Sequence, residues 1–274
     1  MSDSPQTPGP VSAGETEDSG AASVTSTVDS GRSVRAVVGR AAVIIVTATL
    51  VGRLLGLARD MVVADFFGAR PEADAFFLAF KVPYLLTLMV TGALTATFVP
   101  LFSYRLATGR KREAWDLSVN MGNIIAVVLA ALSATLVGIA QWFIPLIGPG
   151  LDDETTAQGV FLFRILMIGL VFEGLTGLVI GMLNSLRRFA LAAFAPAVGT
   201  VVTLIITIVF EPSLGITSLA IGFVAGWVAG LLVLFPGLRG ERIQYRPRID
   251  WHDPGVREVG GMIWPILIGS AVGK

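Results

Sequence analysis

Long apolar runs separated by short polar breaks are the feature that most restricts how this chain can fold. We expect helices at residues 37–65, 74–103, 116–147, 156–184, 189–210 and 214–236, and a seventh that begins near residue 256. An α-helix rises about 1.5 Å per residue, so about 20 apolar residues cross a bilayer. The first six runs reach that length. The pattern predicts an all-α multi-pass membrane protein with six transmembrane helices and a truncated seventh.

Composition excludes a soluble protein and most catalytic classes. Hydrophobic residues make up 54% of the chain and charged residues 15%, whereas about 25% of the residues in a soluble domain are charged. The sequence has no cysteine and a single histidine, His252, which excludes thiolate and histidine-based metal sites. It also lacks a P-loop and a nucleophile paired with a base. We expect no enzymatic activity, no metal and no cofactor, and the net charge of zero does not indicate nucleic acid.

Composition also divides the chain into four parts. Residues 1–35 are rich in Ser, Thr, Gly, Pro and acidic residues, which is typical of a disordered tail. Residues 36–237 hold the six expected spans, and residues 238–255 form a basic connector. Residues 256–274 begin the seventh helix, which is still apolar where the sequence stops. We therefore expect the sequence to be a fragment of a longer protein.

Basic residues concentrate in every second polar break. They are Arg32, Arg35 and Arg40 before the first helix, Arg105, Arg110, Lys111 and Arg112 after the second, Arg187 and Arg188 after the fourth, and Arg239, Arg242, Arg246, Arg248 and Arg257 after the sixth. The other breaks hold only Arg70. Because positive charge stays on the cytoplasmic side, we expect a cytoplasmic N-terminus and a cytoplasmic connector. Trp115 and Trp142 lie near the two ends of the third helix, where interfacial aromatic residues are expected.

Ionisable residues inside the expected spans are the main functional signal. They are Arg53, Arg59 and Asp60 in the first span, Asp74 and Lys81 in the second, and Arg164 and Glu173 in the fourth. An arginine at the bilayer centre costs about 2.5–3.5 kcal/mol, so two in one span predict a polar cavity. The alternative is a buried ion pair such as Arg53 with Asp60. Those two residues lie roughly 10 Å apart along the helix axis, too far for a direct bond.

The chemistry of these residues favours an anionic ligand. Asp74, Lys81 and Gly92 form one stripe of the second helix, and the planar fork of an arginine suits phosphate. Glu173 is either a proton or ion coupling site or the partner of a nearby arginine. Gly52 and Gly56 form a G-x-x-x-G pair, which predicts close helix packing or, alternatively, a flexible point for opening.

Several motifs in this order and spacing are shared with a known family. They are Gly52–Asp60, Phe67–Ala69, Ala73–Phe77, Phe80–Pro83, Phe98–Pro100, Gly181–Pro196 and Pro247–Asp253. From about residue 37 to its end, the chain resembles the N-terminal half of the MurJ/MviN proteins. These are lipid II flippases of the multidrug/oligosaccharidyl-lipid/polysaccharide exporter superfamily, found in the bacterial cytoplasmic membrane.

The resemblance implies a fold and a set of site residues. The family has two six-helix lobes and two further helices around a cavity that faces alternate sides. Its substrate is undecaprenyl-diphosphate carrying the disaccharide-pentapeptide of peptidoglycan. The positions of Arg53, Arg59 and Asp74 are functionally important in the family, and relatives carry basic residues at Lys81 and Arg164. A sodium site, where present, lies in the second half, so we expect an ion gradient or the membrane potential to supply energy.

The chain departs from the family pattern after its Lys-x-Pro motif. Many relatives have an Arg-Arg pair and a Glu-Gly-Ala-Phe run there, whereas this chain has neither in Tyr84–Leu94. The expected partners are a lipid-linked anionic diphosphate, membrane lipids and a missing C-terminal lobe. Besides a lipid II flippase, two alternatives stay open. One is an exporter of another lipid-linked glycan or a drug, and the other is a non-transporting scaffold whose tail recruits proteins.

Overall fold

The fold is known from a computed structural model that describes residues 43, 46–68, 70–241 and 249–261. The described helices belong to one compact unit, Ile44–Lys274. The predicted tail at residues 1–35 lies outside the described residues. All regular structure within the described ranges is helical, which confirms the prediction of an all-α protein.

Five helices of the described part of the chain are long and apolar enough to cross a membrane. They are α2 (Pro71–Ala107), α3 (Lys111–Ile147), α4 (Asp153–Ser185), α5 (Phe189–Leu214) and α6 (Thr217–Leu234), the last continued by the 3-10 turn η1 (Phe235–Leu238). A further helix at residues 46–66 occupies the position of the predicted first span, and residues 254–261 are also helical. The sequence therefore located each of these elements.

Helix ends follow local capping chemistry, and this shifts them from the predicted bounds. Helix α2 begins at Pro71, because proline tolerates the first helical position, where no N–H donor is needed. Helix α5 continues through Pro212 and stops at Gly215, which has a φ of 54°. Glycine adopts this left-handed conformation without steric cost, so α6 starts at Thr217 and not at residue 214.

The start of α4 carries the best-formed cap. The Asp152 carboxylate accepts hydrogen bonds from the Thr155 N–H at 3.0 Å and from its hydroxyl at 2.6 Å. These bonds, the hydroxyl first, hold the pKa of Asp152 below its ordinary value of 3.8. Negative charge at a helix N-terminus also complements the helix dipole.

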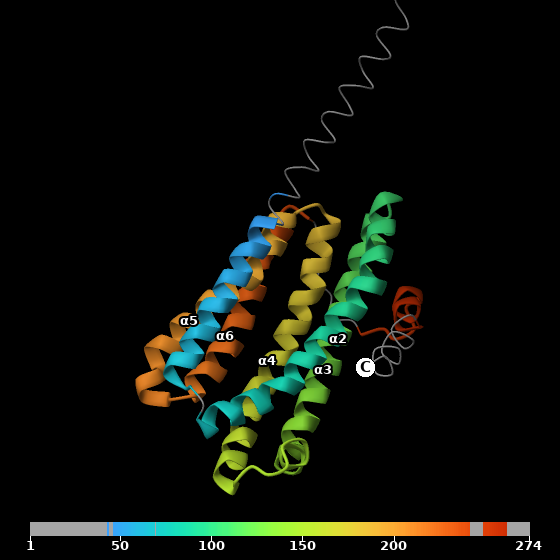
Figure 1. The fold of residues 1–274 in the computed structure, drawn as a ribbon. Coiled ribbons are helices and arrows are strands. Elements are labelled where there is room, and N and C mark those ends of the chain that lie inside the picture. Colours follow the sequence, from blue (N-terminus) through green and yellow to red (C-terminus); the bar gives the residue numbers. More distant parts are fainter. Residues whose placement is uncertain (1–42, 44–45, 69, 242–248, 262–274) are drawn as a thin grey trace, which may run out of the picture. The chain divides into compact units, whose positions relative to one another are not determined.

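Helix α4 is central to the packing of the lobe. It contacts α2, α3 and α6, and α5 lies along α6 (Figure 1). Small residues permit these close contacts, as is usual for helices in membranes. A Cβ atom at Gly169 of α4 would lie 2.1 Å from Cε3 of Trp227, and a Cβ atom at Gly226 of α6 would lie 2.5 Å from the carbonyl oxygen of Gly199. Glycine is therefore required at these two interfaces.

The segment at residues 249–261 docks on α3. The buried Asn120 side chain donates to the Asp250 carbonyl and accepts from the Asp250 N–H, both at 2.9 Å. Val256 and Val259 of the same segment are buried. A Cβ atom at Gly255 would lie 2.6 Å from Nη2 of Arg105. The second half of the predicted connector is thus an ordered part of the lobe, while residues 242–248 lie outside the described residues.

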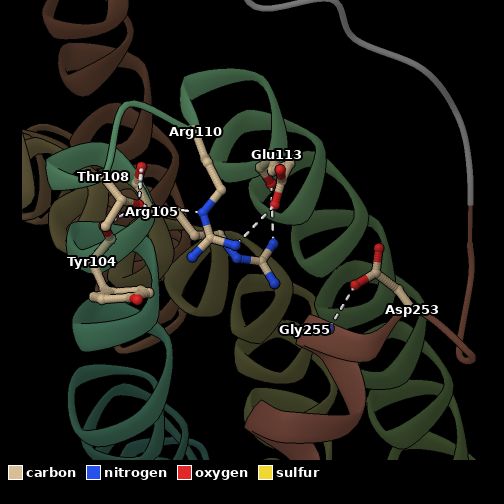
Figure 2. A network of polar contacts seen from close by, with 7 residues as sticks. All are labelled: Tyr104, Arg105, Thr108, Arg110, Glu113, Asp253 and Gly255. Atoms are coloured by element: carbon tan, nitrogen blue, oxygen red, sulfur yellow. Dashed lines mark hydrogen bonds and ion pairs between the residues drawn. The ribbon is translucent and has the colours of Figure 1, made fainter.

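The α2–α3 connection lies beside this segment, and Figure 2 shows both. Arg105 donates to the Glu113 carbonyl at 3.1 Å, and Arg110 lies 3.6 Å from the Glu113 carboxylate. The Asp253 carboxylate accepts the Gly255 N–H at 2.8 Å and caps the helix that follows. Two of the basic residues that the sequence placed in this break, Arg105 and Arg110, therefore connect the ends of two long helices.

One sequence prediction about α3 is wrong. Trp115 is 7% exposed and packs edge-on against Phe102, with 5.5 Å between the ring centroids. It is a core residue of the α2–α3 contact, so it is not an interfacial residue. Trp142, at the other end of α3, is 67% exposed, as an interfacial position requires.

Candidate functional site

Arg59 lies where two adjoining cavities meet. The first, here called the lysine cavity, has a volume of about 560 Å³, and its lining includes Arg59, Asp60 and Lys81. The second, here called the glutamate cavity, has a volume of about 400 Å³, and its lining includes Arg59 and Glu173. Arg59, Phe80, Tyr84 and Phe223 line both. One guanidinium is therefore available to both cavities.

The Arg59 guanidinium is held by an acid and a ring. Its Nη2 and Nε lie 2.8 Å and 3.1 Å from Oδ1 of the adjacent Asp60. Its Cζ lies 5.2 Å from the ring centroid of Phe223, within the range of a cation–π interaction. Asp60 is exposed, with 65% of its side chain accessible, against 30% for Arg59. An exposed ion pair is worth at most about 1 kcal/mol, so an incoming anion can replace Asp60.

Four aromatic residues from α2 and α6 form a wall beside Arg59. The Phe80 ring centroid is 4.6 Å from Phe223, 5.7 Å from Tyr84 and 6.4 Å from Trp227. Phe223 and Trp227 are 5.9 Å apart. We call these four residues the aromatic wall. All four rings line the glutamate cavity, so the wall gives this cavity a surface of packed aromatic rings.

The structure groups some of the predicted site residues and separates others. Lys81 lines the lysine cavity with Arg59, and Glu173 lines the glutamate cavity with it. Arg53, Asp74 and Arg164 are exposed and line neither cavity. Within residues 46–68, 70–241 and 249–261, no ion pair forms at Asp74 or Glu173. The predicted pairing of Glu173 with an arginine is therefore not found there.

The predicted packing role of the glycines is not found either. A Cβ atom at Gly52, Gly56 or Gly92 would meet no atom within 4 Å in the described part of the chain. The G-x-x-x-G pair therefore makes no close helix contact among those residues. Its alternative role, as a flexible point of the first helix, stays a prediction.

The polar floor of the glutamate cavity was not predicted from the sequence. Five threonines line it: Thr87 and Thr91 of α2, Thr176 of α4, and Thr200 and Thr203 of α5. Thr200, Thr203 and Thr207 recur at helical spacing in an otherwise apolar span, which is the pattern that could have revealed them. Tyr84 also lines both cavities and belongs to the stretch that departs from the family pattern.

Sequence comparison decides which family this is. The family profile described as "Lipid II flippase MurJ" matches residues 63–273. The chain belongs to the MurJ family. It is 30% identical over 249 residues to the probable lipid II flippase MurJ of Vibrio cholerae serotype O1, with 86% of this chain and 47% of that relative covered. It is 32% identical over 239 residues to the lipid II flippase MurJ of Burkholderia cenocepacia, with 82% and 46% covered.

The chain thus spans about half the length of the curated MurJ relatives that it matches. Membership of this family, together with five apolar helices of spanning length, makes it a multi-pass protein of the inner membrane. The resemblance noted in the sequence is confirmed.

Solved structures agree on the fold. A lipid II flippase MurJ in an inward closed conformation superposes with a TM-score of 0.70 and 24% identity, covering 83% of this chain and 48% of the other. A MATE crystal structure, solved in complex with MaD3S, gives a TM-score of 0.68 at 15% identity, covering 86% and 54%. At these identities the likeness shows the fold alone.

Proposed function

We propose that this chain is the first lobe of a lipid II flippase. The complete protein would carry undecaprenyl-diphosphate-linked disaccharide-pentapeptide across the cytoplasmic membrane for cell wall synthesis. The observation that carries this proposal is the position of Arg59 between two cavities, with Lys81 lining one of them. Two cations of this kind match the charge of a diphosphate, and the polyprenyl tail would remain in lipid.

The site residues take separate roles in this proposal. Arg59 and Lys81 hold the diphosphate, and its oxygens replace the Asp60 carboxylate on the Arg59 guanidinium. Arg53 is exposed on the same helix as Arg59, so it is available to a second lobe that completes the site. Asp74, two turns before Lys81 on the same face of α2, pairs with a basic residue of the closed state.

Alternating access requires a topology that we also propose. The helix at residues 46–66 is the first of six spans, the N-terminus is cytoplasmic, and residues 256–274 begin the seventh span in a C-terminal lobe. The two lobes rock around the site, as repeat-built transporters do. An ion gradient or the membrane potential supplies the energy, with Arg164 as a candidate coupling group.

Complementation tests the proposal. The complete gene would be expressed in a bacterium depleted of its own flippase, as wild type and as Arg59→Ala. We expect wild type to restore growth and Arg59→Ala to fail, with Arg59→Lys intermediate because lysine keeps the charge but loses the planar fork. Arg112→Ala, an exposed arginine of α3, is the matched control. Growth supported by Arg59→Ala at normal protein levels would refute the site.

A second candidate cargo is another lipid-linked glycan. Tyr84, Thr87 and Thr91 line the glutamate cavity in the stretch where the family arginines and glutamate are missing. A cavity lining that differs from the family pattern favours a head group that also differs. A polar site rejects analogues that leave its hydrogen-bonding groups unpaired. Failure of the wild-type gene to complement, with binding of undecaprenyl diphosphate intact, would favour this cargo.

A further inference from the structure

The glutamate cavity has a composition that phosphate binding does not explain. Residues of α2, α4, α5, α6 and the helix at residues 46–66 line it, and its volume of about 400 Å³ suits a small ligand group. Glu173 is partly buried and makes no hydrogen bond or ion pair with another described residue. A carboxylate oxygen there can accept hydrogen bonds from the O–H or N–H groups of a ligand.

The threonines of this cavity add further acceptors. Thr176, Thr200 and Thr203 donate their hydroxyl protons to the carbonyls of Phe172, Pro196 and Gly199 in their own helices, at 2.8 Å, 3.0 Å and 3.0 Å. A hydroxyl whose proton is used in this way has only lone pairs left to offer. The Thr87 hydroxyl, which also lines the cavity, is buried and has no partner within the described ranges. The polar floor therefore suits a ligand with several O–H or N–H donors.

The aromatic wall lines the same cavity. Aromatic faces carry partial negative charge and attract the polarised C–H groups of a ring packed against them. A pyranose has both surfaces that this cavity requires, since it has an apolar C–H face and a rim of O–H donors. An N-acetylated sugar adds an amide N–H donor. A cavity lined by both acceptors and flat rings is complementary to such a ring.

Charge in the cavity disfavours the main alternative occupant, a metal cation or a proton held by Glu173. Two charged groups, Glu173 and Arg59, are in the described lining, and Tyr84 is a further titratable group there. The Arg59 guanidinium repels a second cation in the same space. The same guanidinium attracts a diphosphate, and the first sugar of a lipid-linked glycan is bonded directly to that diphosphate.

We propose that the glutamate cavity is the subsite for the first sugar ring of the lipid-linked substrate. The ring stacks on the aromatic wall. Its hydroxyl and amide groups donate hydrogen bonds to Glu173 and to the threonine oxygens. The diphosphate stays on Arg59 at the junction with the lysine cavity. This subsite rests on the proposed function, because Arg59 must hold the diphosphate for the sugar to reach the cavity.

Binding measurements with two lipids test the subsite. The complete protein, purified in lipid nanodiscs, would be titrated with undecaprenyl diphosphate and with the same lipid carrying the disaccharide-pentapeptide. Glu173→Gln should weaken binding of the glycosylated lipid about tenfold, as for the loss of one hydrogen bond to a charged acceptor. The affinity for undecaprenyl diphosphate should stay within about twofold of wild type, since that lipid has no sugar to lose a bond.

Two further variants test the aromatic wall and a threonine acceptor separately. Tyr84→Leu keeps an apolar side chain but removes a flat ring, and should weaken only the glycosylated lipid. Tyr104→Leu is its matched control, because Tyr104 is an exposed tyrosine of the same helix that lines neither cavity. Thr200→Val removes one hydrogen-bond acceptor of the cavity and keeps nearly the same side-chain shape. It therefore still tests the subsite if one of the other variants fails to fold.

Each outcome separates the subsite from the proposed function. Equal weakening of both lipids, or of neither, by Glu173→Gln would overturn the subsite, while the function stands if Arg59→Ala weakens both. A change in sodium or pH dependence with unchanged sugar discrimination would assign Glu173 to a cation instead. If Arg59→Ala binds both lipids like wild type, the proposed function fails as well.

Discussion

Arg59 and Glu173 line the same cavity but do not pair with each other. Arg59 is bound to Asp60, with 2.8 Å between Nη2 and Oδ1, and Glu173 forms no ion pair in the described part of the chain. The two side chains carry opposite charges in one lobe and do not pair with each other, so both are available to a ligand.

Replacing Asp60 should free Arg59. Asp60→Asn removes the charge that competes with the diphosphate for the guanidinium. Because an exposed pair is worth about 0.2–1 kcal/mol, we expect undecaprenyl diphosphate to bind up to about fivefold more tightly in a nanodisc titration. Asp116→Asn, at an exposed acid on α3, is the control. Weaker binding by Asp60→Asn would mean that Asp60 positions Arg59 for the ligand.

Adding a methyl group at Gly169 should destabilise the lobe. The new Cβ atom would lie 2.1 Å from Trp227, and overpacking of this kind costs about 1–3 kcal/mol. Thermal unfolding of the purified protein measures the loss. Gly138→Ala, with no described atom within 4 Å of its Cβ atom, should be neutral or stabilising because alanine favours a helix.

Gly56→Ala, in the G-x-x-x-G pair, should not destabilise the protein, in contrast to a methyl group added at Gly169. Its Cβ atom meets no described atom within 4 Å, so the variant should unfold at the wild-type temperature or above. If transport falls while stability holds, Gly56 acts as a flexible point. A clear loss of stability would instead place a close helix contact at Gly56.

The docked segment at residues 249–261 should depend on Asn120. Asn120→Ala removes both 2.9 Å bonds to the Asp250 backbone, and unpaired buried groups cost about 1–3 kcal/mol each. We expect faster amide hydrogen exchange in this segment and little change in α5 and α6. Asn184→Ala, at an exposed position, is the control. Unchanged exchange would show that Val256 and Val259 are sufficient to hold the segment.

The Asp152 cap predicts a pH dependence with a defined sign. Its folded-state pKa lies below the ordinary 3.8, so the cap adds stability above that value and loses it as pH falls through the folded-state pKa. Asp152→Ala should lower the unfolding temperature at neutral pH, and the difference from wild type should disappear in acid. The native Asp153 side chain accepts no cap bond from another described residue. Asp153→Ala should therefore show a smaller difference at neutral pH. A difference that persists in strong acid would contradict the cap.

Much of the fold could be predicted from the sequence, because bilayer thickness and helical rise set the length of each apolar run. The five predicted spans between residues 74 and 236 each correspond to a helix, and several of their ends moved by a few residues, as at Pro71, Pro212 and Gly215. The burial of Trp115 could not be predicted, since an aromatic residue near a helix end fits both an interface and a core. Its contact with Phe102 depends on how α2 and α3 pair.

The site was predicted in part for a similar reason. The cost of burying charge indicated seven ionisable residues in the expected spans. Of these, Arg59, Asp60, Lys81 and Glu173 line the two cavities, and the other three do not. The sequence could not show which charges share a cavity, because that depends on the rotation of each helix. Nor could it distinguish the cavity threonines from those that only bond their own helix. The aromatic wall likewise joins residues of α2 and α6 that are far apart in the chain.

Whether Arg59 holds the diphosphate is tested by the affinity of the complete protein for undecaprenyl diphosphate. This affinity would be compared between wild type and Arg59→Ala. Loss of a charge-assisted bidentate contact should weaken binding at least about tenfold. Arg112→Ala should bind like wild type in the same titration. Equal affinity of wild type and Arg59→Ala would show that the diphosphate is held elsewhere and would contradict the account.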